Sequence, residues 1–134
     1  MKVVLDTNVV ISGIFWKGAP HHILKAWAEG RFELVVSKNI LDEYVSVIRR
    51  IDTEGDLAEK WAVYLTDRAA VVEDTEVLKL ARDPDDDMFI NTAIVSKARF
   101  VVSGDDDLLS LKGESPVRVI TPHVFLKILR KDTR

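Results

Sequence analysis

Acidic residues recur in four separate stretches of the chain, each beside an expected strand end or within an expected helix. Asp6 follows the first apolar run, and Glu43 lies about two turns into a later helical pattern. The two longer stretches are Asp83-Pro84-Asp85-Asp86-Asp87 and Asp105-Asp106-Asp107. Carboxylates held close together repel one another at neutral pH unless a cation compensates them. Because oxygen ligands without Cys or His suit Mg²⁺ or Mn²⁺, these stretches predict a hard-metal site.

A site of this kind suits phosphoryl chemistry. A metal held by carboxylates polarises a phosphate oxygen and lowers the pKa of bound water, and a second ion about 4 Å away can stabilise the leaving oxygen. The chain has no Cys, which excludes thiol catalysis and zinc–thiolate sites. Its three histidines, His21, His22 and His123, lack metal-ligand spacing with one another, and its glycines form no phosphate-binding loop motif.

Each acidic stretch also has a simpler interpretation. An Asp at a helix start accepts free backbone N–H groups and complements the positive end of the helix dipole. The Asp-Pro-Asp sequence is common in turns, and Glu43 alone is a typical solvated helix residue. The metal hypothesis therefore depends on the convergence of all four stretches.

The elements that must position these acids alternate between short apolar runs and helical patterns. Strands are expected at 3–5, 32–36, 70–72, 100–103 and 117–120. Helices are expected at 7–15, 20–29, 57–68, 89–98 and 105–111, together with one that begins after Ser37 and a last one that begins at Thr121-Pro122 and ends at Leu129. Such alternation predicts the α/β class: a single three-layer α/β/α domain over 1–134, with a central, mostly parallel sheet of four to five strands and a frayed tail at 130–134. In such a sheet, ligands bind beyond the carboxyl ends of the strands, where these acids fall.

Composition limits the setting and the partners. The 134 residues carry a formal net charge of −3, and no apolar run approaches the roughly 20 residues that a bilayer requires. The chain begins with a strand-like segment and not with a signal peptide, so we expect a cytoplasmic protein without membrane association. A nucleic-acid partner would need a local basic patch, or metal ions at the acidic site.

Taken in order, four motifs resemble the PIN-domain family. They are Asp6-Thr7-Asn8, the Glu43 of Ile40-Leu41-Asp42-Glu43, the acidic run that ends at Asp87 before a Phe-Ile helix, and Ser103-Gly104-Asp105-Asp106-Asp107-Leu108-Leu109. The resemblance runs from Met1 to about Leu129 and is greatest to the VapC-like branch, the toxin components of bacterial and archaeal toxin–antitoxin pairs. It implies a ribonuclease that uses Mg²⁺ or Mn²⁺ and leaves a 5′-phosphate.

The resemblance also assigns site residues. Those it gives to the metal and to catalysis are Asp6, Glu43, Asp87 and Asp105. Asp86 could replace Asp87, and Asp107 could share the role of Asp105. Asn8 and Ser103 match positions that orient the carboxylates and their waters.

The partners expected from the resemblance are an RNA substrate, a second copy of the chain in a homodimer, and a protein antitoxin that covers the acidic cleft. Positive charges near the predicted mouth are candidates for RNA binding: Lys17, Lys38 and Arg49, with Arg50 and Lys112 as further candidates. Trp16 could stack on a base, pack in the core or form a dimer contact.

Two other phosphate-handling folds place acids at the edge of a parallel sheet, but each needs a residue that this chain lacks. A haloacid-dehalogenase phosphatase needs a second Asp two residues after its nucleophile, whereas Asp6 is followed by Thr7 and Asn8. A receiver domain needs a Lys after its fifth strand, where this chain has Thr121-Pro122. A PIN-like module that binds RNA or protein without catalysis, or a structure-selective DNA nuclease, stays open.

Overall fold

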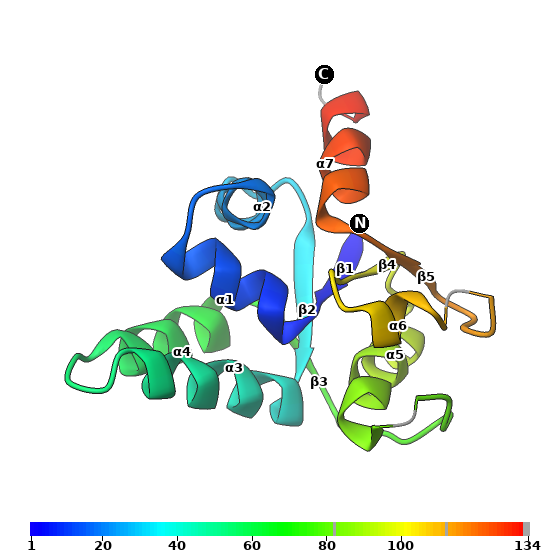
Figure 1. Ribbon diagram of the computed structural model, residues 1–134, viewed down its shortest axis with the longest axis horizontal. Helices are drawn as coiled ribbons and strands as arrows, with labels where there is room; N and C mark the ends of the chain where they lie inside the picture. The colour runs from blue at the N-terminus through cyan, green and yellow to red at the C-terminus, as the bar shows by residue number, and fades with distance from the viewer. Residues whose placement is uncertain (82, 112, 133–134) are drawn as a thin grey trace.

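A computed structural model describes residues 1–81, 83–111 and 113–132. Its strands are β1 (Lys2–Leu5), β2 (Glu33–Ser37), β3 (Ala70–Val72), β4 (Phe100–Val102) and β5 (Arg118–Ile120). Its helices are α1 (Thr7–Phe15), α2 (Ala19–Ala28), α3 (Lys38–Ile51), α4 (Leu57–Arg68), α5 (Pro84–Ser96), α6 (Asp106–Leu109) and α7 (Pro122–Lys131) (Figure 1). The strands form one sheet in the order β3-β2-β1-β4-β5, and all four pairings are parallel. The predicted α/β fold with a parallel sheet is confirmed.

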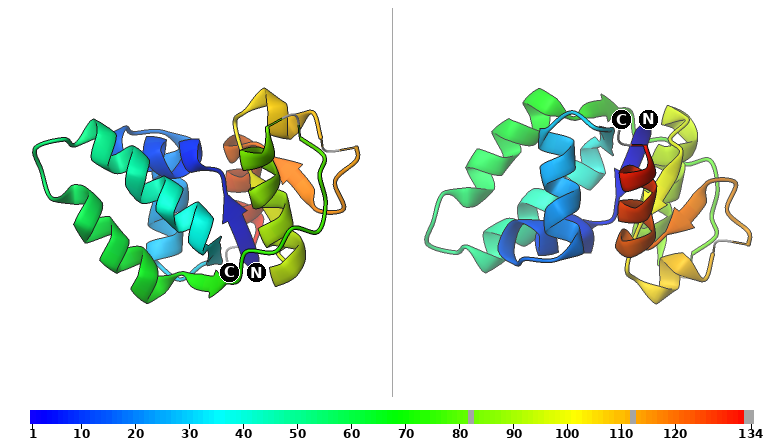
Figure 2. Two further views of the ribbon diagram at one scale, coloured as in Figure 1. Left: turned by 90° about the horizontal axis from the view of Figure 1, so that it is seen from below. Right: turned by 90° about the horizontal axis from the view of Figure 1, so that it is seen from above.

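The strand order places helices on both faces of the sheet. The chain steps from β1 to β2 to β3 in one direction through α1–α4, and it then returns through α5 to β4 on the other side of β1. Figure 2 shows α3 and α4 on one side of β1 and α5 on the other, and α5 contacts β1, β2, β3 and β4. The order in which strands are added to the sheet therefore reverses between β1 and β4. Open parallel sheets bind ligands at such a position.

The core is formed by strands that are covered on both faces. Val3, Val4 and Leu5 of β1 are fully buried, which explains why this strand is an uninterrupted apolar run and not an alternating one. Phe125 of α7 packs edge-to-face against Phe32 and Phe100, and this contact closes one face of the sheet. Gly13 of α1 lies so close to α2 that an added Cβ would stand 2.6 Å from Leu24 Cδ1.

One helix, α5, begins earlier than the sequence predicts. Helix α5 begins at Pro84 instead of Phe89, because the Asp83 carboxylate accepts the N–H of Asp85 and Pro84 occupies the first helical position. Helix α4 begins at Leu57 as expected, and the Asp52 carboxylate accepts the N–H of Leu57.

The C-terminal helix is longer than expected. Helix α7 starts after Thr121, whose hydroxyl accepts the N–H of Val124, and it continues through Lys131. The first two residues of the segment 130–134, which was expected to fray, are thus helical. Residues 133–134 lie outside the described residues. None of the helices formed by the described residues has the length and apolar character needed to cross a membrane.

Candidate metal centre

Asp6 lies at the junction of β1 and α1, beside the position between β1 and β4 where the strand order reverses. Its backbone N–H donates to Val102 O at 2.9 Å, and its side chain is buried, with only 5% of the residue exposed. The Ser103 hydroxyl donates to its Oδ2 at 2.6 Å. Burial raises the pKa of Asp6, the hydrogen bonds from Ser103 and from the Asn8 backbone oppose this, and the charges of Asp105 and Glu43 raise the pKa further.

Ser103 connects two of the acidic stretches. This residue follows β4 and is fully buried, and its Oγ accepts the backbone N–H of Asp105 at 2.9 Å while it donates to Asp6. Asp105 in turn caps α6, because its carboxylate accepts the N–H of Asp107 at 2.9 Å. One hydroxyl therefore sets the position of Asp6 relative to the start of α6. The Asn8 side chain is exposed, and the contact by which Asn8 lowers the pKa of Asp6 comes from its backbone.

Three carboxylates from α5 and α6 gather beside Asp6. Ligand oxygens of Asp86, Asp105 and Asp107 all lie within 4.8 Å of one another. The pKa of Asp86 is raised to about 6, first by burial and then by the negative charges of Asp105, Asp83, Asp6 and Asp107. The shift thus combines burial of the Asp86 carboxyl with the negative charges gathered at the carboxyl ends of β1 and β4.

Glu43 of α3 completes the acidic group from the other side. Its Oε2 accepts a short hydrogen bond from the Thr7 hydroxyl, on the residue directly after Asp6. The Tyr44 hydroxyl donates to the carbonyl of Leu5, on the residue directly before Asp6. Tyr44 is fully buried, and burial together with the charges of Asp6 and Glu43 raises its pKa well above the ordinary value.

Sequence reasoning did not select Thr7 or Tyr44. Thr7 stands inside the first acidic motif, and Tyr44 stands next to Glu43, but Tyr44 also fits the apolar face of α3 and so is typical of a core residue. One sequence feature indicates a role at the site: Thr7 directly follows Asp6, and Tyr44 directly follows Glu43.

Asp87 makes its hydrogen bonds with the connector between β3 and α5 and not with this acidic group. Its Oδ1 accepts the backbone N–H groups of Leu80 and Ala81, at 3.0 and 2.7 Å, in the connector between β3 and α5. Only 7% of the residue is exposed. Successive residues of an α-helix are rotated by about 100°, so Asp86 and Asp87 in the first turn of α5 cannot point the same way. The structure thus brings Asp86, and not Asp87, together with Asp105.

The cations expected near the acids are mostly engaged elsewhere. Lys38 pairs with Asp42 at 3.2 Å, and Arg49 pairs with Glu59 of α4 at 3.0 Å. Lys17 is exposed, and it follows the far end of α1, the nine-residue helix that begins beside Asp6 and spans about 13 Å. Arg50 is exposed near the distal end of α3, and Trp16 is 60% exposed. Lys112 lies outside the described residues.

The donors of this site fit a divalent cation with a preference for oxygen. Asp86, Asp105 and Asp107 offer carboxylate oxygens that lie within 4.8 Å of one another. Asp6 interacts electrostatically with Asp86, Asp105 and Glu43, so two further carboxylates lie near this group. Mg²⁺ and Mn²⁺ favour such oxygen sets. A cation would also offset the repulsion that raises the pKa of Asp86.

Comparison with known proteins identifies the family. The sequence model of the PIN-domain family matches residues 2–107, a range that includes all four acidic stretches. The chain belongs to the PIN-domain family. Proteins of this family are generally nucleases. This PIN domain is also similar to the uncharacterized protein MJ1680 of Methanocaldococcus jannaschii, with 30% identity over 98% of this chain and 93% of the relative.

Solved structures agree with the fold of this PIN domain. VapBC2 from Rickettsia felis, bound to a DNA fragment from its promoter, superimposes with a TM-score of 0.63 at 14% identity. The match covers 90% of this chain and 98% of the matched chain. FitAB bound to a DNA fragment gives a TM-score of 0.54 at 17% identity, with 90% and 94% covered. A domain of a functionally unknown Methanocaldococcus jannaschii protein gives 0.54 at 16% identity, with 88% of each chain covered. At these identities the likeness establishes the shared fold.

Proposed function

We propose that this PIN domain is an endoribonuclease that hydrolyses RNA phosphodiester bonds with Mg²⁺ or Mn²⁺ at a carboxylate site. The observation that carries the proposal is the approach of ligand oxygens of Asp86, Asp105 and Asp107 to within 4.8 Å of one another, beside the buried Asp6. We assign the metal to Asp6, Glu43, Asp86 and Asp105. Asp86 replaces Asp87 in this assignment because both backbone contacts of Asp87 lie in the connector.

The chain's own residues would prepare this site before substrate arrives. Ser103 holds the Asp6 carboxylate and the start of α6 together, and Thr7 orients Glu43 toward Asp6. Tyr44 fixes the carbonyl that precedes Asp6, so β1 and α3 keep their relative position. A cation held there would polarise a phosphate oxygen and lower the pKa of a water molecule. The carboxylates would hold its charge and orient that water toward the phosphorus.

The biological partners follow from the same proposal. We assign this chain the role of a toxin in a toxin–antitoxin pair, with a protein antitoxin, a homodimeric state and a cytoplasmic location. The similarity to VapBC2 and FitAB, which are complexes of toxin with antitoxin, supports the antitoxin partner. An antitoxin segment carrying a Lys or Arg could neutralise the carboxylates in place of the metal.

Cleavage of labelled nucleic acids tests the proposal. Purified protein is incubated with single-stranded RNA, hairpin RNA and single-stranded DNA, each with Mn²⁺, Mg²⁺ or EDTA, beside Asp6→Asn prepared identically. We expect cuts in RNA that leave a 5′-phosphate, need the metal and disappear in the variant. Metal-dependent cuts in DNA alone would identify a DNA nuclease instead. No cleavage, together with no rise of Tm on addition of metal, would identify a binding module without catalysis.

A further inference from the structure

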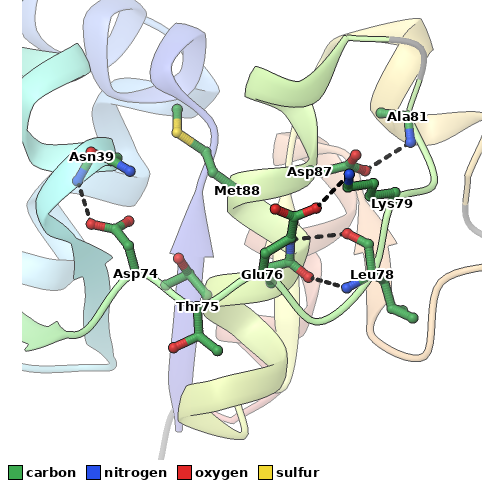
Figure 3. Close-up of a pocket in the computed structure, with 11 residues that line it drawn as sticks. Asn39, Asp74, Thr75, Glu76, Leu78, Lys79, Ala81, Asp87 and Met88 are labelled. Carbon is green, nitrogen blue, oxygen red and sulfur yellow. Dashed lines mark hydrogen bonds and ion pairs between the residues drawn. The ribbon is translucent and has the colours of Figure 1, made fainter.

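A cavity of about 460 Å³ lies between the connector after β3, the first turn of α3 and helix α5. Asn39 and Asp74 line one side of it, and Figure 3 shows Met88 extending from α5 between Asn39 and Asp87. The volume falls within the range of sites for small ligands. No metal ligand of the proposed centre lines this cavity, so it is a separate feature of the molecule.

The wall formed by the connector is held in place by α5. Two side chains one helical turn apart, Asp87 and Asn91, accept the backbone N–H groups of four connector residues: Leu80 and Ala81, and Val77 and Leu78. Asn91 also donates to the carbonyl of Leu78. These contacts fix a segment that has no helix or strand of its own. They also engage four of the N–H groups of the connector, which are then not free to bind a ligand.

The charged groups that line the cavity are mostly carboxylates, which only accept hydrogen bonds when ionised, whereas the two amides and two hydroxyls of the lining can donate as well as accept. Carboxylates of Asp74, Glu76 and Asp87 line it, and the lysine among the lining residues, Lys79, pairs with Glu76 at 3.2 Å. The Asp74 carboxylate also accepts the backbone N–H of Asn39 at 3.1 Å, which fixes its position at the start of α3. The Met88 side chain adds a polarisable apolar surface of the kind that packs well against flat rings. The complementary ligand is planar and carries N–H donors.

The cavity adjoins the proposed metal centre through both of its helices. Asn39 stands one helical turn before Glu43 on α3, so their Cβ atoms are about 5–6 Å apart. Asp87 and Met88 directly follow Asp86 on α5. A nucleotide whose phosphate lies at the carboxylates could therefore place its base in the cavity.

We infer that this cavity is a nucleobase subsite that selects bases with an exocyclic amino group over uracil, at a nucleotide flanking the cleaved phosphodiester. The inference rests on the proposed function for the position of the phosphate. Adenine, cytosine and guanine present N–H₂ donors to the carboxylates, whereas the O4 of uracil faces them as an acceptor. In this account Asp87 is a positioning residue that maintains the wall of the subsite.

The two methionines of the chain, Met1 and Met88, allow a binding test that needs no cleavage. Protein labelled with ¹³C at the methionine methyl groups is titrated with adenosine, cytidine and uridine, without metal. Nucleosides carry no phosphate, so the acidic centre does not contribute. We expect the Met88 methyl resonance to shift with adenosine and cytidine at lower concentrations than with uridine, while Met1 stays fixed. Equal responses to all three nucleosides, or none, would overturn the inference.

Cleavage selectivity provides the second test. Otherwise identical RNA oligonucleotides that vary one flanking base are cleaved by the wild type, by Asp74→Asn and by Asp67→Asn, a control that removes the same charge from the exposed face of α4. We expect the wild type and the control to prefer an amino-bearing base by about tenfold in kcat/KM at one flanking position. Asp74→Asn, which replaces an acceptor oxygen by a donor amide, should reduce or invert that preference.

The outcomes separate the inference from the proposed function. Metal-dependent RNA cleavage with the same base preference in Asp74→Asn as in the control overturns the subsite and leaves the nuclease standing. Methyl shifts selective for amino-bearing nucleosides, without cleavage of any RNA, support a base-binding pocket and contradict the nuclease. Thermal unfolding of each variant establishes that the comparison is made between folded proteins.

Discussion

Replacing each of three consecutive acids of α5 by Asn distinguishes a metal ligand from a structural carboxylate. Asp85, Asp86 and Asp87 lie in the same helical turn, and each substitution removes one negative charge and keeps the side-chain size. Their surroundings differ: Asp85 is exposed, Asp86 faces Asp105 and Asp107, and Asp87 accepts two backbone N–H groups. The three variants should therefore behave in three different ways.

The Asp86→Asn variant should be more stable than the wild type when metal is absent. The pKa of Asp86 is about 6 in the folded protein and about 3.9 in an unfolded chain. The folded state thus binds the proton more tightly, and ionisation lowers stability as pH rises between about 4 and 6. Two pKa units correspond to about 3 kcal/mol at most. Because Asp86 is only partly buried, we expect a gain of about 1–2 kcal/mol at pH 7.5 and no gain at pH 4.

The other two substitutions provide the contrast. Asp87→Asn should lower the free energy of unfolding by about 1 kcal/mol, because two backbone N–H groups would then donate to a neutral amide oxygen instead of a charged carboxylate. Asp85→Asn should change it by less than about 0.5 kcal/mol, as for other exposed positions.

Thermal unfolding at pH 7.5 and pH 4, with and without Mn²⁺, measures these effects. For a chain of this length, 1 kcal/mol corresponds to roughly 3–4 °C in Tm. Mn²⁺ should raise the Tm of the wild type, Asp85→Asn and Asp87→Asn, and much less that of Asp86→Asn. The reasoning is refuted if Asp87→Asn loses the Mn²⁺ effect while Asp86→Asn keeps it, or if metal-free Asp86→Asn is less stable than the wild type.

Three further outcomes are expected. Tyr44→Phe should cost about 1–3 kcal/mol in urea unfolding, because the buried Leu5 carbonyl loses its donor; unchanged stability would contradict that contact. Gly13→Ala should cost about 1–3 kcal/mol in the same assay, since the new Cβ would stand 2.7 Å from the Pro20 carbonyl; a neutral effect would show that α1 and α2 separate easily. Mn²⁺ affinity, measured by calorimetry, should fall about tenfold per pH unit below pH 6 as protons compete for Asp86, and a flat profile would exclude this carboxylate as a ligand.

The sequence predicted the fold well because the central strands β1 and β4 are almost entirely buried. Val3–Leu5 and Val101–Val102 form short apolar runs with no polar face, and each is followed within a few residues by an acid. Once such runs alternate with helical patterns, a parallel sheet with helices on both faces follows. The same reasoning placed Asp6 and Asp105 at one edge of the sheet.

The choice between Asp86 and Asp87 depended on a detail that periodicity does not reveal. The apolar pattern begins at Phe89, so the helix was expected to begin there, whereas Asp83 and Pro84 start α5 five residues earlier. Inside a helix the two carboxylates point in different directions, and the connector that Asp87 binds has no sequence signal of its own. The hydrogen bonds of Thr7 and Tyr44 join residues 36 and 39 positions apart, which depends on the packing of α3 against β1.

Anomalous diffraction from crystals soaked in Mn²⁺ tests the central claim most directly, because it locates the ion without depending on the correct RNA. We expect a peak bound by carboxylate oxygens of Asp6, Asp86 and Asp105, with Glu43 facing it, and no peak at Asp87. An ion bound by Asp87, or crystals saturated with Mn²⁺ that show no ion between β1 and β4, would contradict the account of this edge of the sheet as a metal centre.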